Sequence, residues 1–204
     1  MLAAYGAGRR REDGGLRRHL EHAADEGRIP EVVILGLPSG HSATEGSLIA
    51  RDIDLRAADY LPGYHQDRFA QHLAFAVTEA IPFIEQEFEF TTERRCTIAA
   101  GQSNSGVFAL AAALNAPERF GGALVMSRGY ETYLADIPTS GSDQRMAFTG
   151  GVYEPYFLRS TRRTYDRLKD HLGAAQFQTY VNGHDDTQWR LALYEHAPFV
   201  FEGC

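Results

Sequence analysis

Short apolar runs alternate with amphipathic segments along most of the chain. Several of these runs are continuous, with no polar residue at every second position, which is typical of strands buried on both faces of a parallel sheet. The expected strands are 31–37, 96–100, 123–127, the first part of 144–155, and 175–183.

Between these runs, apolar residues recur every three or four positions, a spacing that predicts helices. In the segment 64–88 we expect Pro82 to kink or interrupt the helix, because proline has no backbone N–H. The segment 38–63 has no sustained period and is expected to be a long loop. The expected helices are 16–30, 64–88, 104–115 and 156–174, with a helix or an irregular tail over 187–203.

Strand and helix therefore alternate at least four times. This order predicts the α/β class, with a doubly wound and mostly parallel sheet. The chain has 204 residues, of which 44% are hydrophobic, so it can bury a sizeable core. No repeat, low-complexity tract or linker divides it, and we expect residues 1–204 to form a single domain.

Charge, hydrophobicity and cysteine content indicate which partners and which cell compartment to expect. The formal net charge is −7 and the arginines are scattered, so we expect no nucleic-acid partner. No run of about 18 apolar residues predicts a membrane span. The apolar residues of the N-terminus precede its arginines, the reverse of a secretory signal, which favours a cytoplasmic protein. With only Cys96 and Cys204, a disulfide framework is implausible, and a reducing compartment is expected. Cys96 is expected to be a small buried hydrophobic residue.

One short segment, 101–105, carries the chemistry that the sequence suggests. Gly-Gln-Ser-Asn-Ser approximates the G-x-S-x-G turn that presents a nucleophilic serine between a buried strand and a helix. Such a turn places Ser103 over the helix N-terminus, where the amide of Asn104 can donate to a developing oxyanion. The alternatives are a chance match or a helix-capping role for Ser103.

A serine nucleophile needs a base. In this fold the base follows the serine along the chain, which leaves His171, His184 and His196. His184 comes directly after the last expected strand and a glycine, so it is the expected base. His171 lies in a charged helix and His196 lies in the tail.

The base in turn needs an acid that orients it. Glu154 follows a strand and a Gly-Gly turn, which is the position such an acid requires, and it is the expected acid. Asp185 is the reserve, although neighbouring residues rarely point at one another well. Further candidates after the serine include Asp136, Asp143 and Asp186.

Three segments, 99–127, 150–173 and 182–193, resemble one branch of the α/β-hydrolases. This is the esterase D branch, and within it the enterochelin (ferric enterobactin) esterase-like proteins. The resemblance covers about residues 30–204. It implies an α/β-hydrolase fold, a Ser-His-Glu triad that cleaves carboxylic esters through an acyl-enzyme, and no metal or organic cofactor. The implied partner is a small-molecule ester of the siderophore type or another small acyl ester.

The N-terminus departs from the family pattern. The opening segment resembles the end of an early strand of the family, with Tyr5-Gly6 where Asp-Gly is usual, and the strands before it are missing. The resemblance places the second oxyanion donor at the N–H of Ala7. A shortened N-terminus predicts an unpaired sheet edge, which a second copy of the chain could cover as a homo-oligomer.

The resemblance also suggests residues that contact substrate. The segment 38–63 resembles the region over the family's active site, so Arg51, Arg56 and Tyr60 are expected to meet an anionic or aromatic substrate. Hydrated or salt-bridged loop residues are the alternative. Trp189 is expected either to shape the pocket rim or to anchor the last helix in the core.

The sequence is therefore consistent with three functions. The first is a serine ester hydrolase. The second is an acyltransferase that uses the same triad with another acceptor. The third is a non-catalytic binding or scaffold protein that keeps the serine turn for packing.

Overall fold

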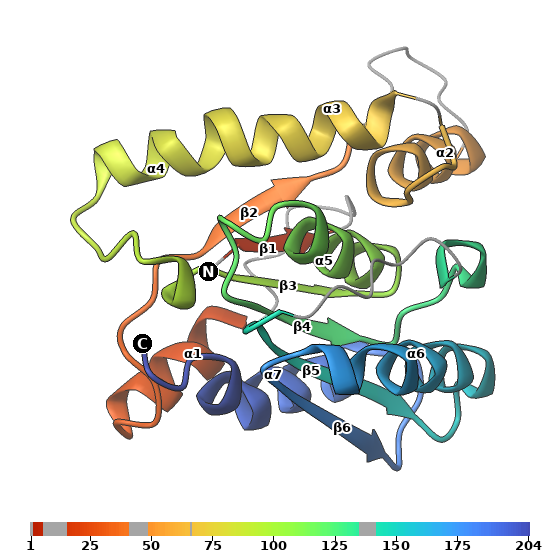
Figure 1. Ribbon diagram of the computed structural model, residues 1–204. Helices are drawn as coiled ribbons and strands as arrows, with labels where there is room; N and C mark the ends of the chain where they lie inside the picture. The colour runs from red at the N-terminus through yellow and green to blue at the C-terminus, as the bar shows by residue number, and fades with distance from the viewer. Residues whose placement is uncertain (1, 6–15, 41–48, 66, 135–141) are drawn as a thin grey trace.

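All described strands of the computed structural model lie parallel in one sheet (Figure 1). The structure describes residues 2–5, 16–40, 49–65, 67–134 and 142–204. The strands are β1 (Leu2–Tyr5), β2 (Leu35–Pro38), β3 (Ile98–Gln102), β4 (Gly122–Met126), β5 (Arg145–Gly151) and β6 (Ala174–Tyr180), in the spatial order β2-β1-β3-β4-β5-β6. The predicted α/β class and parallel sheet are confirmed.

Helices cover both faces of this sheet. They are α1 (Leu16–Asp25), α2 (Ile49–Tyr60), α3 (Arg68–Phe75), α4 (Ile81–Glu87), α5 (Asn104–Asn115), α6 (Pro155–Leu168) and α7 (Asp186–Val200). Short 3₁₀ segments span Arg94–Cys96, Glu131–Leu134 and Lys169–His171. None of the described helices has the length and apolar character needed to cross a bilayer.

The central strands are apolar on both sides, and each side feeds a separate core. Ile98 and Ala100 of β3 pack with α1 and α7, while Ala99 between them packs with α5 on the other face. Such alternation between two buried faces explains why β3 and β4 read as continuous apolar runs. Figure 1 shows α1 and α7 side by side on one face.

The segment 38–63, expected to be a loop, contains the helix α2. Ala57, Tyr60 and Leu61 at its end are buried in the core that includes α5. Charged residues interrupt the apolar spacing between 51 and 59, so the pattern alone showed no helical period. Packing of the last turn against α5 accounts for the helix where local pattern did not.

The expected helix 64–88 is divided by a π-helical segment, Ala76–Ala80. The N–H of Ile81 donates to the carbonyl of Ala76, five residues earlier. This wider turn precedes Pro82, which stands in the first turn of α4 and has no N–H to donate. The predicted interruption at Pro82 is confirmed.

The exposed edge of the sheet lies elsewhere than expected. β1 is an interior strand that pairs with both β2 and β3. The outer strand on this side is β2, so the expected unpaired edge belongs to residues 35–38 and not to the N-terminal strand. Coverage of this edge by a second copy of the chain stays a prediction.

The two cysteines form a disulfide, contrary to the expectation from their number. Cys96 stands just before β3 and Cys204 follows the last turn after α7, with their Cα atoms 5.1 Å apart. Packing of α7 against the sheet brings together residues 108 positions apart in the sequence, which spacing alone does not show. The disulfide removes the cysteine argument for a reducing compartment.

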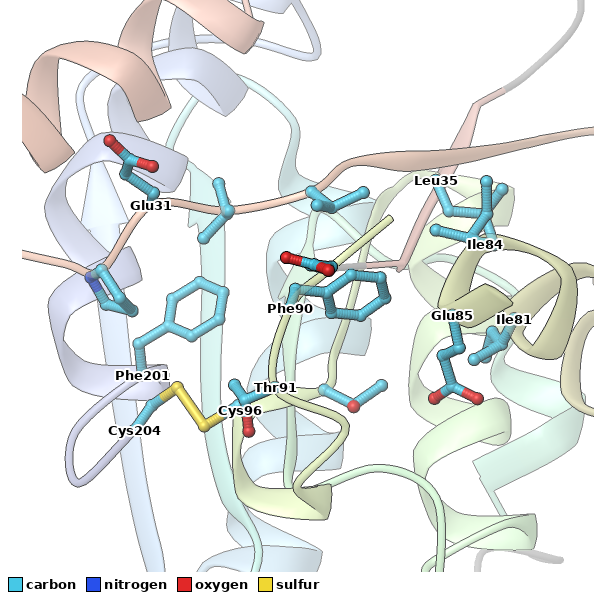
Figure 2. Close-up of a pocket in the computed structure, with 15 residues that line it drawn as sticks. Glu31, Leu35, Ile81, Ile84, Glu85, Phe90, Thr91, Cys96, Phe201 and Cys204 are labelled. Atoms are coloured by element: carbon cyan, nitrogen blue, oxygen red, sulfur yellow. A yellow bond between two sulfur atoms is a disulfide. The ribbon is translucent and has the colours of Figure 1, made fainter. Parts of the chain in front are cut away.

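A cavity of about 250 Å³ adjoins this disulfide (Figure 2). Apolar side chains of Leu35, Ile81, Ile84 and Phe201 contribute to its wall. The cavity lies at the start of β3, whereas Ser103 follows the end of the same strand. It is therefore separate from the site described next.

Candidate active site

Ser103 occupies a strained turn between β3 and α5. Its backbone angles, φ 56° and ψ −126°, lie where non-glycine residues rarely occur. The Ser103 N–H donates to the carbonyl of Met126 at 3.0 Å, and the Ser103 carbonyl accepts from Gly106 N at 3.0 Å. These bonds hold the serine in the conformation expected of a nucleophile turn.

Gly101 and Gly106, on either side of the turn, have no room for a side chain. A Cβ built on Gly101 would lie 2.1 Å from the carbonyl oxygen of Ser105, and one on Gly106 would lie 2.9 Å from that of Met126. Ser105 replaces the second glycine of the motif and is fully buried. Its hydroxyl donates to the Gln102 carbonyl at 2.7 Å and accepts from the Gln102 N–H at 3.1 Å, so it closes the turn.

Glu154 and His184 meet at the same edge of the sheet. Glu154 follows the end of β5 and His184 follows the end of β6, so both lie at the carboxyl edge where Ser103 follows β3. Nδ1 of His184 lies 2.5 Å from Oε2 of Glu154. The Glu154 side chain is 2% exposed and that of His184 is 30% exposed.

The other candidates for acid and base have different surroundings. The Asp185 carboxylate caps α7 by accepting from Thr187 N at 2.9 Å and Gln188 N at 3.1 Å. His196 lies within α7, with Nδ1 3.3 Å from the side-chain oxygen of Gln176. His171 ends the 3₁₀ segment after α6. The geometry therefore pairs Glu154 with His184.

The hydrogen bonds fix the protonation of this pair. Burial acts to raise the pKa of Glu154, but hydrogen bonds from His184, Ser127, Gln188 and the Gly151 N–H outweigh it and hold that pKa below its usual value. An ionised carboxylate can only accept, so Nδ1 of His184 must carry a proton. Nε2 of the neutral ring is then left as an acceptor, the form that a general base needs.

Two aromatic rings hold the imidazole of His184. Phe157 stacks on it with ring centroids 3.9 Å apart and planes 24° apart. Trp189 approaches edge-on, with centroids 4.9 Å apart. Phe157 of α6 and Trp189 of α7 thus both restrain the ring.

Behind the carboxylate lie residues that the sequence analysis did not identify. The Ser127 hydroxyl donates to Oε1 of Glu154 at 2.6 Å, and the Gln188 amide donates to the same oxygen at 2.8 Å. Ser127 directly follows β4, so the rule that polar groups at strand ends share one edge could have found it. Gln188 carries no such signal, because its position depends on how α7 packs.

The predicted oxyanion donors are only in part within the described structure. Asn104 is the first residue of α5, and the first N–H groups of a helix have no acceptor within it. Its amide therefore lies beside Ser103 at the positive end of the helix dipole. Ala7 lies outside the described residues.

The predicted substrate contacts are changed by the structure. Tyr60 has no exposed surface, and its hydroxyl donates to the Leu37 carbonyl at 2.6 Å, so it is a core residue with no face for substrate. Arg51 belongs to α2, but its side chain is outside the described residues. Burial lowers the pKa of Arg56, which lies over the Tyr60 ring. Trp189 packs against His184, and its contact with substrate stays a prediction.

The described residues contain no cluster of side chains suited to bind a metal ion. Among the described residues, no three or more His, Cys, Asp and Glu side chains gather as metal ligands would. The expected absence of a cofactor stays a prediction.

The parallel sheet, the serine turn after β3 and the acid and histidine after later strands define an α/β-hydrolase fold. Residues 8–200 match the family model described as Putative esterase, and the chain belongs to this family.

The chain is similar to esterases of known sequence and structure. It is 28% identical to the iron(III) enterobactin esterase of Escherichia coli K12 over 130 residues, which cover 57% of this chain and 32% of that protein. The enterobactin esterase of Shigella flexneri superposes with a TM-score of 0.73 at 20% identity, covering 98% of this chain and 52% of that one. The chain thus spans about half the length of this structural relative and about a third of the curated one.

A second structural relative is shorter. The feruloyl esterase module of Clostridium thermocellum, solved with sinapinate, gives a TM-score of 0.71 at 13% identity, covering 98% of this chain and 76% of the module. At these identities the structural likeness shows the shared fold.

Proposed function

We propose that the protein is a serine hydrolase that cleaves carboxylic esters, with Ser103, His184 and Glu154 as its triad. The observation that carries this proposal is the hydrogen bond between Glu154 and His184 at the edge of the sheet that also presents Ser103 in a strained turn. Membership of the esterase family supports the same reaction.

The reaction follows from the protonation of the pair. Oγ of Ser103 attacks the ester carbonyl while Nε2 of His184 accepts its proton, and Glu154 stabilises the imidazolium that forms. The tetrahedral intermediate collapses, the C–O bond to the alcohol breaks, and His184 returns the proton to the departing alkoxide. Water then attacks the acyl-enzyme with the same proton transfers, which releases the acid and restores Ser103.

The negative oxygen of the intermediate needs donors fixed in advance. The proposed first donor is the Asn104 amide, which the helix dipole of α5 assists. The proposed second donor is the Ala7 N–H. Loss of one such donor lowers kcat by about a hundredfold or more in other hydrolases.

The proposed substrates are small esters with an aromatic or siderophore-type group. Aromatic side chains of α6 and the residue before Glu154 stand at this edge: Tyr153 is 73% exposed and Tyr156 is 45% exposed. The hydroxyl of Tyr156 accepts from the Tyr130 N–H at 3.2 Å, which joins the turn after β4 to α6. Exposed rings of this kind suit a flat aromatic ester.

Covalent labelling with a fluorophosphonate tests the proposal. The wild-type protein should be labelled and the Ser103→Ala variant should not, because the reagent bonds to an activated serine. An ester panel of short acyl, aromatic and catecholate substrates then defines the class cleaved. A wild-type protein that is neither labelled nor able to hydrolyse p-nitrophenyl acetate would overturn the proposal.

A further inference from the structure

We propose that Ser127 is a positioning residue of this site. Its hydroxyl accepts hydrogen bonds from Trp189 and Gln188 and donates one to Glu154, which keeps the carboxylate directed at His184. The inference rests on the proposed function, in which Glu154 orients the base.

The hydrogen bonds of the Ser127 hydroxyl are complete. It accepts from Nε1 of Trp189 at 2.8 Å and from Nε2 of Gln188 at 2.8 Å. It donates to Oε1 of Glu154 at 2.6 Å. A hydroxyl has one proton and two lone pairs, so these contacts use its full capacity and fix the direction of its proton toward the acid.

Gln188 reinforces this direction. It is fully buried, and its Nε2 donates to both Ser127 and Oε1 of Glu154. The amide cannot be turned over, because its oxygen would then face the carboxylate. A Cβ built on Gly151 would lie 2.1 Å from Oε1 of Gln188, so the bare backbone at this position gives the amide its room.

The two oxygens of Glu154 are therefore assigned different tasks. Oε1 accepts from Ser127, Gln188 and the Gly151 N–H, the last at 2.6 Å. Oε2 accepts from Nδ1 of His184. Because Oε1 is held by three donors from separate segments, the carboxylate cannot rotate, and Oε2 keeps its aim.

The backbone of Ser127 is held in an uncommon conformation. Its φ is 48°, and its N–H donates to the Thr149 carbonyl at 2.8 Å. The next residue, Arg128, is fully buried and donates through Nη1 to Thr164 of α6 and through Nη2 to the Tyr130 carbonyl at 2.7 Å. The turn after β4 is thus anchored to α6, and this places the Ser127 hydroxyl beside Glu154.

Few charged groups lie near the Glu154 carboxylate. Among the described residues, His184 is the titratable side chain in contact with Glu154. Ser127 and Gln188 are neutral, the Arg128 guanidinium is turned to Thr164 and the Tyr130 carbonyl, and the Asp185 carboxylate is turned to the amides of α7. A change at Ser127 therefore acts on the Glu154–His184 pair without a second charge to compensate.

Loss of the Ser127 hydroxyl has a predictable direction. It removes one of the hydrogen bonds that keep the pKa of Glu154 low. The carboxylate then attracts protons more strongly, so the Glu154–His184 pair takes up its proton at higher pH. A hydrogen bond to a charged group corresponds to a shift of about one pH unit in the pKa of the group that accepts it. Ser127 acts on the imidazole only through Glu154, so the midpoint of the pair moves in the same direction by less than this.

Trp189 is the single tryptophan of the sequence and lies edge-on to His184. Because a protonated imidazole quenches a neighbouring indole, the intrinsic fluorescence should change as the pair takes up its proton. The transition in the wild type is assigned by its loss in the His184→Gln variant. This readout does not depend on substrate.

Two variants carry the test. Ser127→Gly removes the hydroxyl and suits the positive φ, and Ser127→Ala removes it with a side chain retained. Both should move the fluorescence midpoint upward relative to the wild type. The matched control is Ser160→Ala, a fully buried hydroxyl of α6 that bonds to the Gly129 carbonyl and does not touch Glu154; it should leave the midpoint unchanged. Equal midpoints in wild type and Ser127→Gly would overturn the inference.

Kinetics separate this inference from the proposed function. The Ser127 variants should lose about ten- to a hundredfold in kcat with KM little changed, and the acid limb of kcat/KM should move with the fluorescence midpoint. An inactive wild type with a shifted midpoint in the variants would sink the hydrolase proposal and keep the network. An active wild type whose acid limb is the same in the Ser127 variants would sink the network and keep the hydrolase.

Discussion

The close approach at Gly101 is the most restrictive feature of the serine turn. An added methyl group would meet the backbone of Ser105, which cannot move without opening α5. We expect Gly101→Ala to lower the free energy of unfolding by about 3 kcal/mol. Chemical denaturation measures this, and a loss below about 1 kcal/mol would show that the turn relaxes easily.

The low pKa of Glu154 has a consequence for acid stability. A carboxyl whose pKa in the folded state lies below its unfolded value stabilises the fold above that unfolded value, and this stabilisation disappears as the pH falls through the folded pKa. The Glu154→Gln variant lacks this contribution. Its melting temperature should therefore depend less on pH than that of the wild type below about pH 4.5, as circular dichroism at a series of pH values would show.

Glu154 and His184 could be predicted from the sequence, and the same rule could have found Ser127 after β4, while Gln188 could not be predicted. The first two follow strands, and the topology of a parallel sheet places strand ends at one edge whatever the side chains do. Gln188 acts through a rotamer and through the docking of a helix, which no local pattern shows. The prediction that Tyr60 contacts substrate was wrong. Its charged sequence neighbours indicated an exposed position, whereas the ring is fully buried.

At the scale of single elements, the start of α7 links helix stability to the site. Asp185 caps the helix that carries Gln188 and Trp189. We expect Asp185→Ala to cost about 1 kcal/mol of stability and to reduce the rate, because the cap also fixes Gln188. Fluorophosphonate labelling should persist in this variant. Its complete loss, with the fold intact, would instead favour Asp185 as the acid.

Element boundaries show where sequence patterns succeed. The helix after the serine turn was predicted at 104–115, and α5 spans those residues, because a small-residue run between two glycine-rich turns has few other solutions. The helix α2 was missed, since charged residues broke its period and the packing of Ala57 and Tyr60 at its end is a tertiary contact that no local pattern shows. Pro82 was read correctly because a missing N–H acts locally.

At the scale of the whole molecule, the Cys96–Cys204 disulfide closes a loop over half the chain. The two residues are 108 positions apart, and a loop of that length corresponds to about 4 to 5 kcal/mol of stabilisation in the chain-entropy description. Reduction should therefore lower the melting temperature clearly. Thermal unfolding with and without a reducing agent measures this effect, with the Cys96→Ser/Cys204→Ser double variant as control, which should not respond to the reagent.

The same disulfide lies at the opposite end of β3 from Ser103. At temperatures well below unfolding, we expect the reduced protein to keep its rate of ester hydrolysis, since none of the triad residues contacts either cysteine. A parallel loss of activity and disulfide at 25 °C would contradict this separation.

The residues other than glycine with positive φ in the described chain are Ser103, Ser127 and Tyr130, all in the turns that follow β3 and β4. For protein engineering, this concentration means that substitutions chosen to relieve backbone strain would all fall at the carboxyl edge of the sheet. Glycine at any of these positions would relieve about 1 kcal/mol or more of backbone strain. The same change would remove the proposed nucleophile Ser103, the proposed positioning hydroxyl of Ser127 or the side chain of Tyr130, so stability and activity cannot be optimised independently there.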